Sequence, residues 1–293
     1  TVIEGNSISR PTRTNAGNFT GIYFTSEKNT GCLVSKNRIF DPFGSDLTST
    51  REFYGIHFNS SDGSADAVNT VSNNLIYKVN GNGPVYGIAN TGSDYAWYFH
   101  NTISLDEISS TSTSTTRGFY QTTTAGGLFF YNNIISITRG GTGNKHCIYL
   151  NANLPAGADY NNYYINAAGG INSLGYYTSN RTNISDWRTA TNLDANSLTA
   201  LPAYTDPANG DYTPGNAGID NKGIALGVVA DDILGVVRST TTPDVGAYEF
   251  TPPPCSTPPV NGKTLISADT ICQNSLVYLG MDIGAFGSAQ TFQ

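Results

Sequence analysis

The chain has 293 residues and a formal net charge of −7, with 13% charged residues, 32 glycines and 18 tyrosines. Because no basic surface is available to neutralise phosphates, this charge argues against nucleic acid as a partner. No apolar run approaches the roughly 18 residues of a membrane-spanning helix, so we expect no insertion into a bilayer. The composition favours an all-β protein rich in turns.

Two motifs alternate along the first 180 or so residues, with copies roughly 30 residues apart, and such a period indicates a repeat architecture. The first motif places apolar residues three positions before and two positions after an Asn. Its Asn residues are Asn6, Asn37, Asn74, Asn101, Asn133 and Asn162. The second motif is a short strand that usually begins with Gly. Its third residues are Tyr23, His57, Ala89, Tyr120, Tyr149 and Tyr177.

The repeat unit predicts one coil of a parallel β-helix. Apolar residues alternate with a period of two, and the alternation breaks at the Asn, which indicates a corner. Asn suits a corner because it tolerates left-handed backbone and its side chain bonds to backbone groups. In stacked coils each Asn lies about 4.8 Å from the next, so the amides form a ladder. We expect three strands per coil and about six to eight coils.

Stacking also predicts two buried columns, since one coil cannot cover its own apolar side. The first column contains Ile8, Ile39, Ile76, Ile103 and Ile135. The second contains Ile22, Ile56, Ile88, Phe119 and Ile148. Turns of variable length, including residues 41–53 and the Ser/Thr run at 109–116, are predicted surface loops beside the Gly-strand face.

After residue 182 the repeat disappears. Residues 184–188 predict a short helix capped by Asn183 or Ser185. The Pro- and Gly-rich residues 201–221 predict loops and short strands that close the end of the column. We therefore divide the chain into a β-helix at 1–250, a Pro-rich linker at 251–259 and the incomplete start of a β-sandwich module at 260–293.

These motifs resemble the right-handed parallel β-helix proteins of the pectate-lyase-like superfamily. Residues 184–187, 201–207 and 244–250 resemble the way many secreted bacterial members end. The strand pattern around Cys272 resembles the opening of bacterial immunoglobulin-like surface modules, although Asn274 stands near the Gly expected there. The resemblance implies a segment of a longer secreted or cell-surface protein. In the enzymes of this group, polysaccharide lies on the Gly-strand face.

The four cysteines suggest export. Cys32 and Cys147 are three stacked intervals apart, roughly 14 Å, which is beyond the reach of a disulfide, so we expect free, buried thiols. Cys255 and Cys272 can pair with each other, or Cys272 can pair outside this segment. No Cys or His spacing indicates a zinc site. We expect no cofactor or metal. Calcium is kept as an alternative, although no residues indicate a site for it.

The outward positions of the Gly strand offer a candidate glycan-binding surface made of Tyr23, His57, Tyr120, Tyr149 and Tyr177. Aromatic rings stack on sugar rings, and nearby hydroxyl and amide groups bond to sugar hydroxyls. Beside these rings lie Thr25, Asn59, Thr91, Thr122, Asn151 and Ser179. The simpler interpretation is that tyrosines on neighbouring strands stack for stability.

No catalytic residue is assigned, because these outward positions carry no Asp, Glu, Lys or Arg. Loop carboxylates are the remaining candidates, namely Asp41, Asp46, Glu52, Asp106 and Glu107. We favour a non-catalytic, adhesin-like surface module that contacts glycans. The alternative is a polysaccharide lyase or glycoside hydrolase, which requires two or more carboxylates that converge in one groove.

Overall fold

The computed structural model describes residues 1–12, 17–25 and 29–253, and the backbone of β22 (Thr264–Ile266) and β23 (Leu279–Met281). The chain divides into two compact units, Thr1–Thr251 and Pro252–Gln293. In the second unit, β22 and β23 form an antiparallel pair. Most of the predicted linker and module, with Cys255 and Cys272, lies outside the described residues.

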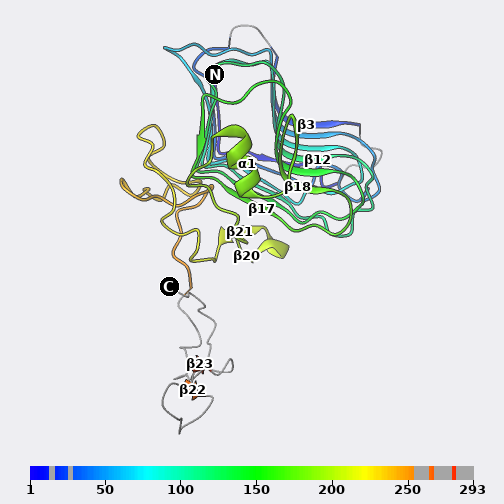
Figure 1. The fold of residues 1–293 in the computed structure, drawn as a ribbon. Helices are drawn as coiled ribbons and strands as arrows, with labels where there is room; N and C mark the ends of the chain where they lie inside the picture. Colours follow the sequence, from blue (N-terminus) through cyan, green and yellow to red (C-terminus); the bar gives the residue numbers. More distant parts are fainter. Residues whose placement is uncertain (13–16, 26–28, 254–263, 267–278, 282–293) are drawn as a thin grey trace. The chain divides into compact units, whose positions relative to one another are not determined.

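The first unit is a parallel β-solenoid of about 5 turns, which confirms the predicted fold class (Figure 1). Sheet A contains β1 (Val2–Glu4), β4 (Leu33–Ser35), β7 (Asn69–Ser72), β10 (Ala96–Phe99), β13 (Phe129–Tyr131) and β16 (Gly157–Asp159). Sheet B contains β2 (Ser7–Ile8), β5 (Arg38–Phe40), β8 (Leu75–Tyr77), β11 (Thr102–Leu105), β14 (Ile134–Ile137) and β17 (Asn162–Ile165).

Sheet C carries the Gly-strand motif, and its parallel strands are longer than the strands of the other two sheets. It contains β3 (Phe19–Thr25), β6 (Phe53–Asn59), β9 (Val85–Thr91), β12 (Thr116–Thr123), β15 (Lys145–Leu150), β18 (Asn172–Tyr177) and β19 (Ser179–Arg181). All these strands pair in parallel except β19, which runs antiparallel to β18.

The corner between sheets A and B uses two adjacent residues rather than one. The left-handed backbone predicted for the ladder Asn lies instead on the residue before it, at Lys36, Asn73, His100, Asn132 and Tyr160, with φ between 53° and 58°. This turn directs the following Asn side chain into the buried corner, where its amide meets the next coil.

In the ladder, each Asn Oδ1 accepts hydrogen bonds from the backbone N and Nδ2 of the Asn one coil earlier. At Asn101 these bonds come from Asn74, at 3.1 and 2.9 Å. The ladder runs through Asn6, Asn37, Asn74, Asn101, Asn133 and Asn161. Asn162 was the wrong choice for its last position. The two adjacent asparagines made the register ambiguous by one residue, and Asn162 points the other way, toward Ala200.

Both predicted apolar columns are buried, except that Ile8, in the first coil, is only half-buried. The motif Gly is explained by close packing between the columns. A Cβ on Gly87 would lie 2.6 Å from Ile103 Cγ2 and 2.6 Å from the Gly118 carbonyl oxygen, so no side chain fits there. Cys32 and Cys147 are buried free thiols, as predicted.

The C-terminal end of the column is closed by α1 (Ile184–Thr191), which confirms the predicted helix. Asn183 is its cap, and its side chain accepts a hydrogen bond from Asp186 N. Trp187 is fully buried against the end of the core, where its Nε1 donates to Asp194. In the described part of the chain, no helix has the length and apolar character that a membrane crossing requires.

Residues 201–221 do not close the column end, contrary to the prediction. They form β20 (Tyr204–Asp206), the 3-10 helix η1 (Pro207–Asn209) and β21 (Asp211–Pro214), and they pack on the outer side of sheet B. The physical reason is that this side carries an apolar cluster. Leu75 and Tyr77 point outward there, and Tyr212 covers them with its ring 4.9 Å from that of Tyr77.

Candidate functional site

The outer face of sheet C brings most of the predicted binding residues into one row. Strand pairing aligns Tyr23, His57, Ala89, Tyr120, Tyr149 and Tyr176. Tyr177, predicted for the last position, is therefore wrong by one residue: it pairs with Leu150 and packs against the core. The motif was assigned one residue too late because, in the last coil, Gly175 occupies the position that the core residue Ile148 has in the coil before.

The ring of Trp187 explains this exchange. A Cβ on Gly175 would lie 2.5 Å from the indole ring, so the closing helix fills the volume that an isoleucine side chain occupies in the earlier coils. The true sixth copy of the Gly-strand motif is residues 174–176. It could not be recognised in the sequence because its middle residue is Gly rather than a buried apolar residue.

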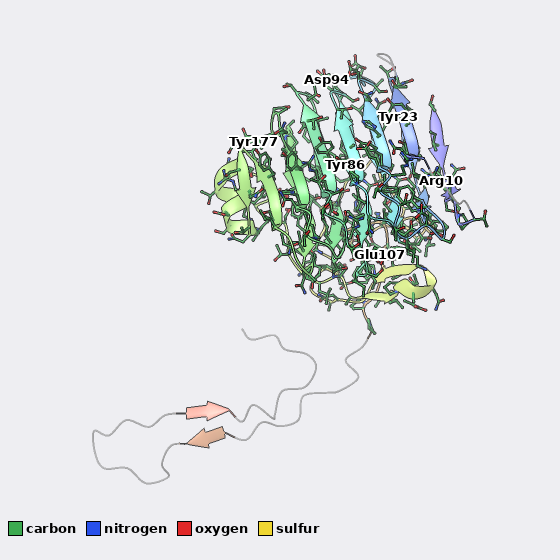
Figure 2. The ribbon with its side chains drawn as sticks, turned by 90° about the vertical axis from the view of Figure 1, so that its right-hand side faces the viewer. Arg10, Tyr23, Tyr86, Asp94, Glu107 and Tyr177 are labelled. Atoms are coloured by element: carbon green, nitrogen blue, oxygen red, sulfur yellow. The ribbon has the colours of Figure 1, made fainter. Side chains whose placement is uncertain are left out.

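A second row of aromatic residues was missed in the sequence; Figure 2 labels Tyr86 from this row and Tyr23 from the first. Tyr54 and Tyr86 lie on neighbouring strands three residues before the first row. Ala89 leaves a gap, and Tyr86 leans over it to stack on Tyr54 at 4.6 Å and on Tyr120 at 4.6 Å. The aromatic column, as we name it, comprises Tyr23, His57, Tyr54, Tyr86, Tyr120, Tyr149 and Tyr176.

The rings of this column stack mainly on one another. The planes of Tyr54 and Tyr86 differ by 17°, and those of Tyr149 and Tyr176 by 9° with centroids 4.4 Å apart. Stacked rings cover each other's faces, so the half-exposed rings present mainly their edges to solvent. Tyr86 is buried, and the Tyr54 hydroxyl donates to Glu52 Oε1 at 3.3 Å. Sugar stacking on ring faces is thereby restricted, and hydrogen bonding by the ring edges becomes the main contact available.

One cation interrupts the column. Arg117 lies over the rings of Tyr149 and Tyr120, with its guanidinium carbon 3.6 and 4.4 Å from their centroids. These two rings are tilted by 53° and are 5.7 Å apart, unlike the parallel pairs on either side. At this point of the surface, the planar guanidinium group of Arg117 packs against the faces of the two rings.

A chain of hydrogen bonds borders the first three strands of the column. His57 Nε2 lies 2.9 Å from Thr91 Oγ1, which donates to Asn59 Oδ1, and Asn59 Nδ2 donates to Tyr23 OH at 2.9 Å. Burial lowers the pKa of His57 to about 4, so its imidazole is neutral at pH 7. This border offers neutral donors and acceptors.

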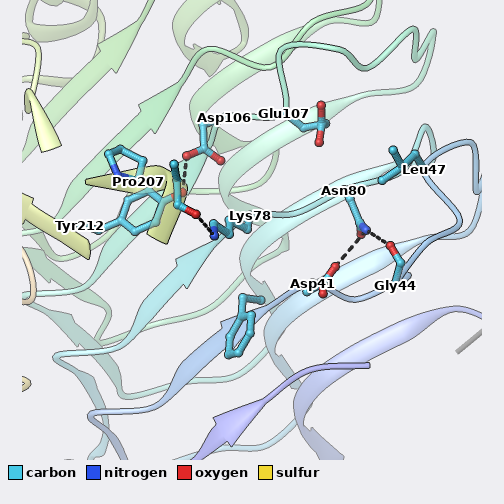
Figure 3. Close-up of a pocket in the computed structure, with 11 residues that line it drawn as sticks. Asp41, Gly44, Leu47, Lys78, Asn80, Asp106, Glu107, Pro207 and Tyr212 are labelled. Atoms are coloured by element: carbon cyan, nitrogen blue, oxygen red, sulfur yellow. Dashed lines mark hydrogen bonds between the residues drawn. The ribbon is translucent and has the colours of Figure 1, made fainter. Parts of the chain in front are cut away.

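A separate pocket of about 490 Å³ lies between the turns after β5 and β11 and the η1 segment (Figure 3). The turns place Asp41, Asp106 and Glu107 in its wall, and we call it the acidic pocket. Of the loop carboxylates predicted as candidates, Asp46 and Glu52 are not among the residues that line it.

The pocket holds two of its carboxylates firmly. Asp106 accepts hydrogen bonds from Tyr212 OH and Ser104 Oγ, and Asp41 accepts one from Asn80 at 3.1 Å. Burial raises the pKa of the Asp106 carboxyl. Burial also raises the pKa of Asp41, against the opposing charge of Lys78. A carboxyl that keeps its proton more readily can donate it to a leaving group.

Other carboxylates have structural partners. Asp206 caps η1, Asp232 accepts from the backbone N of Leu234, and Asp244 accepts from the backbone N of Phe250. Among the described residues, no three His, Cys, Asp or Glu side chains gather as metal ligands.

Comparison of the chain with protein-family models, with curated proteins and with solved structures finds no match.

Proposed function

We propose that this chain is a non-catalytic β-solenoid module of a secreted or cell-surface protein, adhesin-like in kind, which contacts a polysaccharide along the aromatic column of sheet C. The observation that carries the proposal is the column itself. Seven rings on six neighbouring strands follow one another with centroids 4.4 to 5.7 Å apart, beside a border of hydroxyl and amide groups. An extended polymer that lies along the stack meets a similar set of contacts at each coil.

The wider context supports the same proposal. The repeat motifs resemble right-handed β-helices of the pectate-lyase-like superfamily, and the Pro-rich residues 251–259 fit a linker to an immunoglobulin-like module. A multidomain architecture of this kind suits a protein displayed outside the cell. Fold resemblance alone fixes no activity, so the ring surface bears the functional argument.

The test replaces Tyr120, Tyr149 and Tyr176 together with Ala. These side chains are half-exposed on the sheet surface, so the core is preserved and folding should survive while polysaccharide binding falls. Binding is measured on a glycan array and by affinity electrophoresis in polysaccharide gels. The matched control replaces three partly exposed tyrosines outside sheet C, which are Tyr95, Tyr131 and Tyr164. Equal binding by the two triple variants would reject the aromatic column as the binding surface.

The acidic pocket favours a second candidate, a polysaccharide-degrading enzyme. There Asp106 would donate a proton to the leaving sugar, while Asp41 or Glu107 would act as base or nucleophile. The test is incubation with polysaccharides and measurement of new reducing or unsaturated ends. Turnover by the wild type that Asp106→Asn abolishes would replace the non-catalytic proposal with this one.

A further inference from the structure

Two tyrosines on the last two coils, Tyr149 in β15 and Tyr176 in β18, form a closely stacked parallel pair, which we call the terminal pair. Their ring centroids are 4.4 Å apart, and the ring planes differ by 9°. The two residues are in register on parallel strands, so both side chains leave the sheet in the same direction and their hydroxyl groups lie on the same side. Both rings are half-exposed, and reagents in solution can therefore reach them.

Arg117 separates the terminal pair from the rest of the aromatic column. Its guanidinium carbon lies 3.6 Å from the ring centroid of Tyr149 and 4.4 Å from that of Tyr120. The rings of Tyr120 and Tyr149 are tilted by 53° and are 5.7 Å apart. Strands β12 and β18 lie on opposite sides of β15. Tyr149 therefore has a cation against one face and the parallel phenol of Tyr176 against the other.

The other stacked tyrosine pairs of sheet C are less accessible. Tyr86 stacks on Tyr54 and on Tyr120, so both of those pairs share one ring. That ring is buried, and the hydroxyl group of Tyr54 donates to Glu52. Among the stacked tyrosine pairs of the described residues, the terminal pair is thus the one in which both rings are half-exposed.

We propose that the terminal pair is a site of oxidative cross-linking, at which hydrogen peroxide and a peroxidase join the two rings as a dityrosine. Each phenol loses one electron and its hydroxyl proton, and peroxide takes up these electrons and protons and is reduced to water. The two phenoxyl radicals form a bond between ring carbons next to the oxygens. The hydrogens of those carbons then move to the oxygens, which restores both phenols.

The geometry of the terminal pair suits this bond. Two directly bonded rings have their centroids at nearly the separation observed here, so the rings have to rotate about their long axes while the strands keep their places. The bond fastens the last coil to the coil before it. A last coil has a stacked coil on one side only and opens more readily than inner coils. A covalent link between coils restricts the unfolded chain, as a disulfide does. This inference goes beyond polysaccharide binding and does not rest on it.

The experiment oxidises the dilute protein with hydrogen peroxide and a haem peroxidase and isolates the monomer by gel filtration. Trypsin then leaves residues 146–181 as one peptide, which contains both tyrosines of the terminal pair. Cleavage before Asp159 divides this peptide into two fragments, which stay together where a cross-link joins them. The first fragment has Tyr149 as its only tyrosine, so tandem mass spectrometry identifies the residue bonded to it.

The variants are Tyr149→Phe and Tyr176→Phe, which keep the stacked rings but remove one phenol each. Tyr95→Phe is the control at an exposed tyrosine outside sheet C. We expect the monomers of the wild type and of Tyr95→Phe to carry the cross-link of the terminal pair, and the other two variants to lose most of the dityrosine fluorescence. The melting midpoint of the cross-linked monomer should rise by roughly 5–15 °C, as for a disulfide that closes a loop of similar length.

Three results would overturn the cross-linking site. They are a wild-type monomer without dityrosine under conditions that couple free tyrosine, equal dityrosine fluorescence in Tyr176→Phe and the wild type, and a different tyrosine as the main partner of Tyr149. Cross-links confined to oligomers would also reject it. An unchanged melting midpoint in the cross-linked monomer would overturn its stabilising role. Polysaccharide binding is measured on the unoxidised protein, so failure of that proposal and failure of this one are separate results.

Discussion

The Asn ladder makes a quantitative prediction for Asn101→Ala. The Asn101 amide takes part in four hydrogen bonds in a fully enclosed corner. It accepts from Asn74 N at 3.1 Å and Asn74 Nδ2 at 2.9 Å, and it donates to Val71 O at 2.9 Å and Asn133 Oδ1 at 3.0 Å. Removal of the amide leaves the buried backbone N of Asn74 without this acceptor.

The expected cost is roughly 1–3 kcal/mol of the free energy of unfolding, which is the penalty for a buried donor without a partner. One kcal/mol shifts the melting midpoint of a domain of this size by roughly 2–4 °C. Asn101→Asp should cost more than Asn101→Ala. A carboxylate keeps the acceptor for Asn74 but places an oxygen opposite Val71 O and Asn133 Oδ1, and it buries a charge.

Thermal and urea denaturation followed by circular dichroism measure these effects, with Asn6→Ala as the matched control. Asn6 is exposed and begins the same ladder, so its loss should cost a few tenths of a kcal/mol. A midpoint for Asn101→Ala equal to that of Asn6→Ala would refute the ladder as a source of stability. An Asp variant as stable as the Ala variant would refute the assigned bonding direction.

Three further predictions concern the core, the closed end and the C-terminal segment. Ile103→Ala should cost about 2–5 kcal/mol in urea unfolding, because the side chain is fully buried. Gly175→Ala should lower the melting temperature, since its Cβ would lie 2.5 Å from the ring of Trp187, whereas Gly227→Ala, with open space around it, should not. Burial raises the pKa of Asp244 to about 6 from 3.8, so its contribution to stability is full below pH 3.8 and is lost as the pH rises through about 6. The unfolding free energy of the wild type, relative to Asp244→Asn, should therefore fall over this range in urea titrations at several pH values.

The sequence predicted the repeat, the buried columns and the ladder because these features recur in every coil. Because the pattern returns six times, an exception in one copy does not obscure it. The known distance between stacked strands then gives the position of each coil along the column. The side chains of Ile39 and Ile103 could be assigned to one column without coordinates because each stands two residues after its corner Asn. Local physics was sufficient for this part of the fold.

Both register errors occurred in the last coil, where stacking neighbours exist on only one side. Asn162 replaced Asn161 in the ladder, and Tyr177 replaced Tyr176 in the aromatic row. In the last coil the core is completed by Trp187, which is supplied by the closing helix rather than by another coil. The residues of this coil have to accommodate the indole ring of Trp187, and the repeat period alone does not indicate this.

The position of residues 201–250 could not be predicted because its contacts join distant parts of the chain. Arg238 Nη2 donates to Asn73 Oδ1 at 2.8 Å across 165 residues, and Gly246 N donates to Asn132 O at 2.6 Å. One signal was present: several outward residues of sheet B are apolar, among them Phe40, Leu75 and Ile134, although polar residues lie between them. Such apolar side chains need cover, and the segment after the solenoid supplies it. Because that cover packs on sheet B, the aromatic column of sheet C keeps its ring edges in reach of an external ligand.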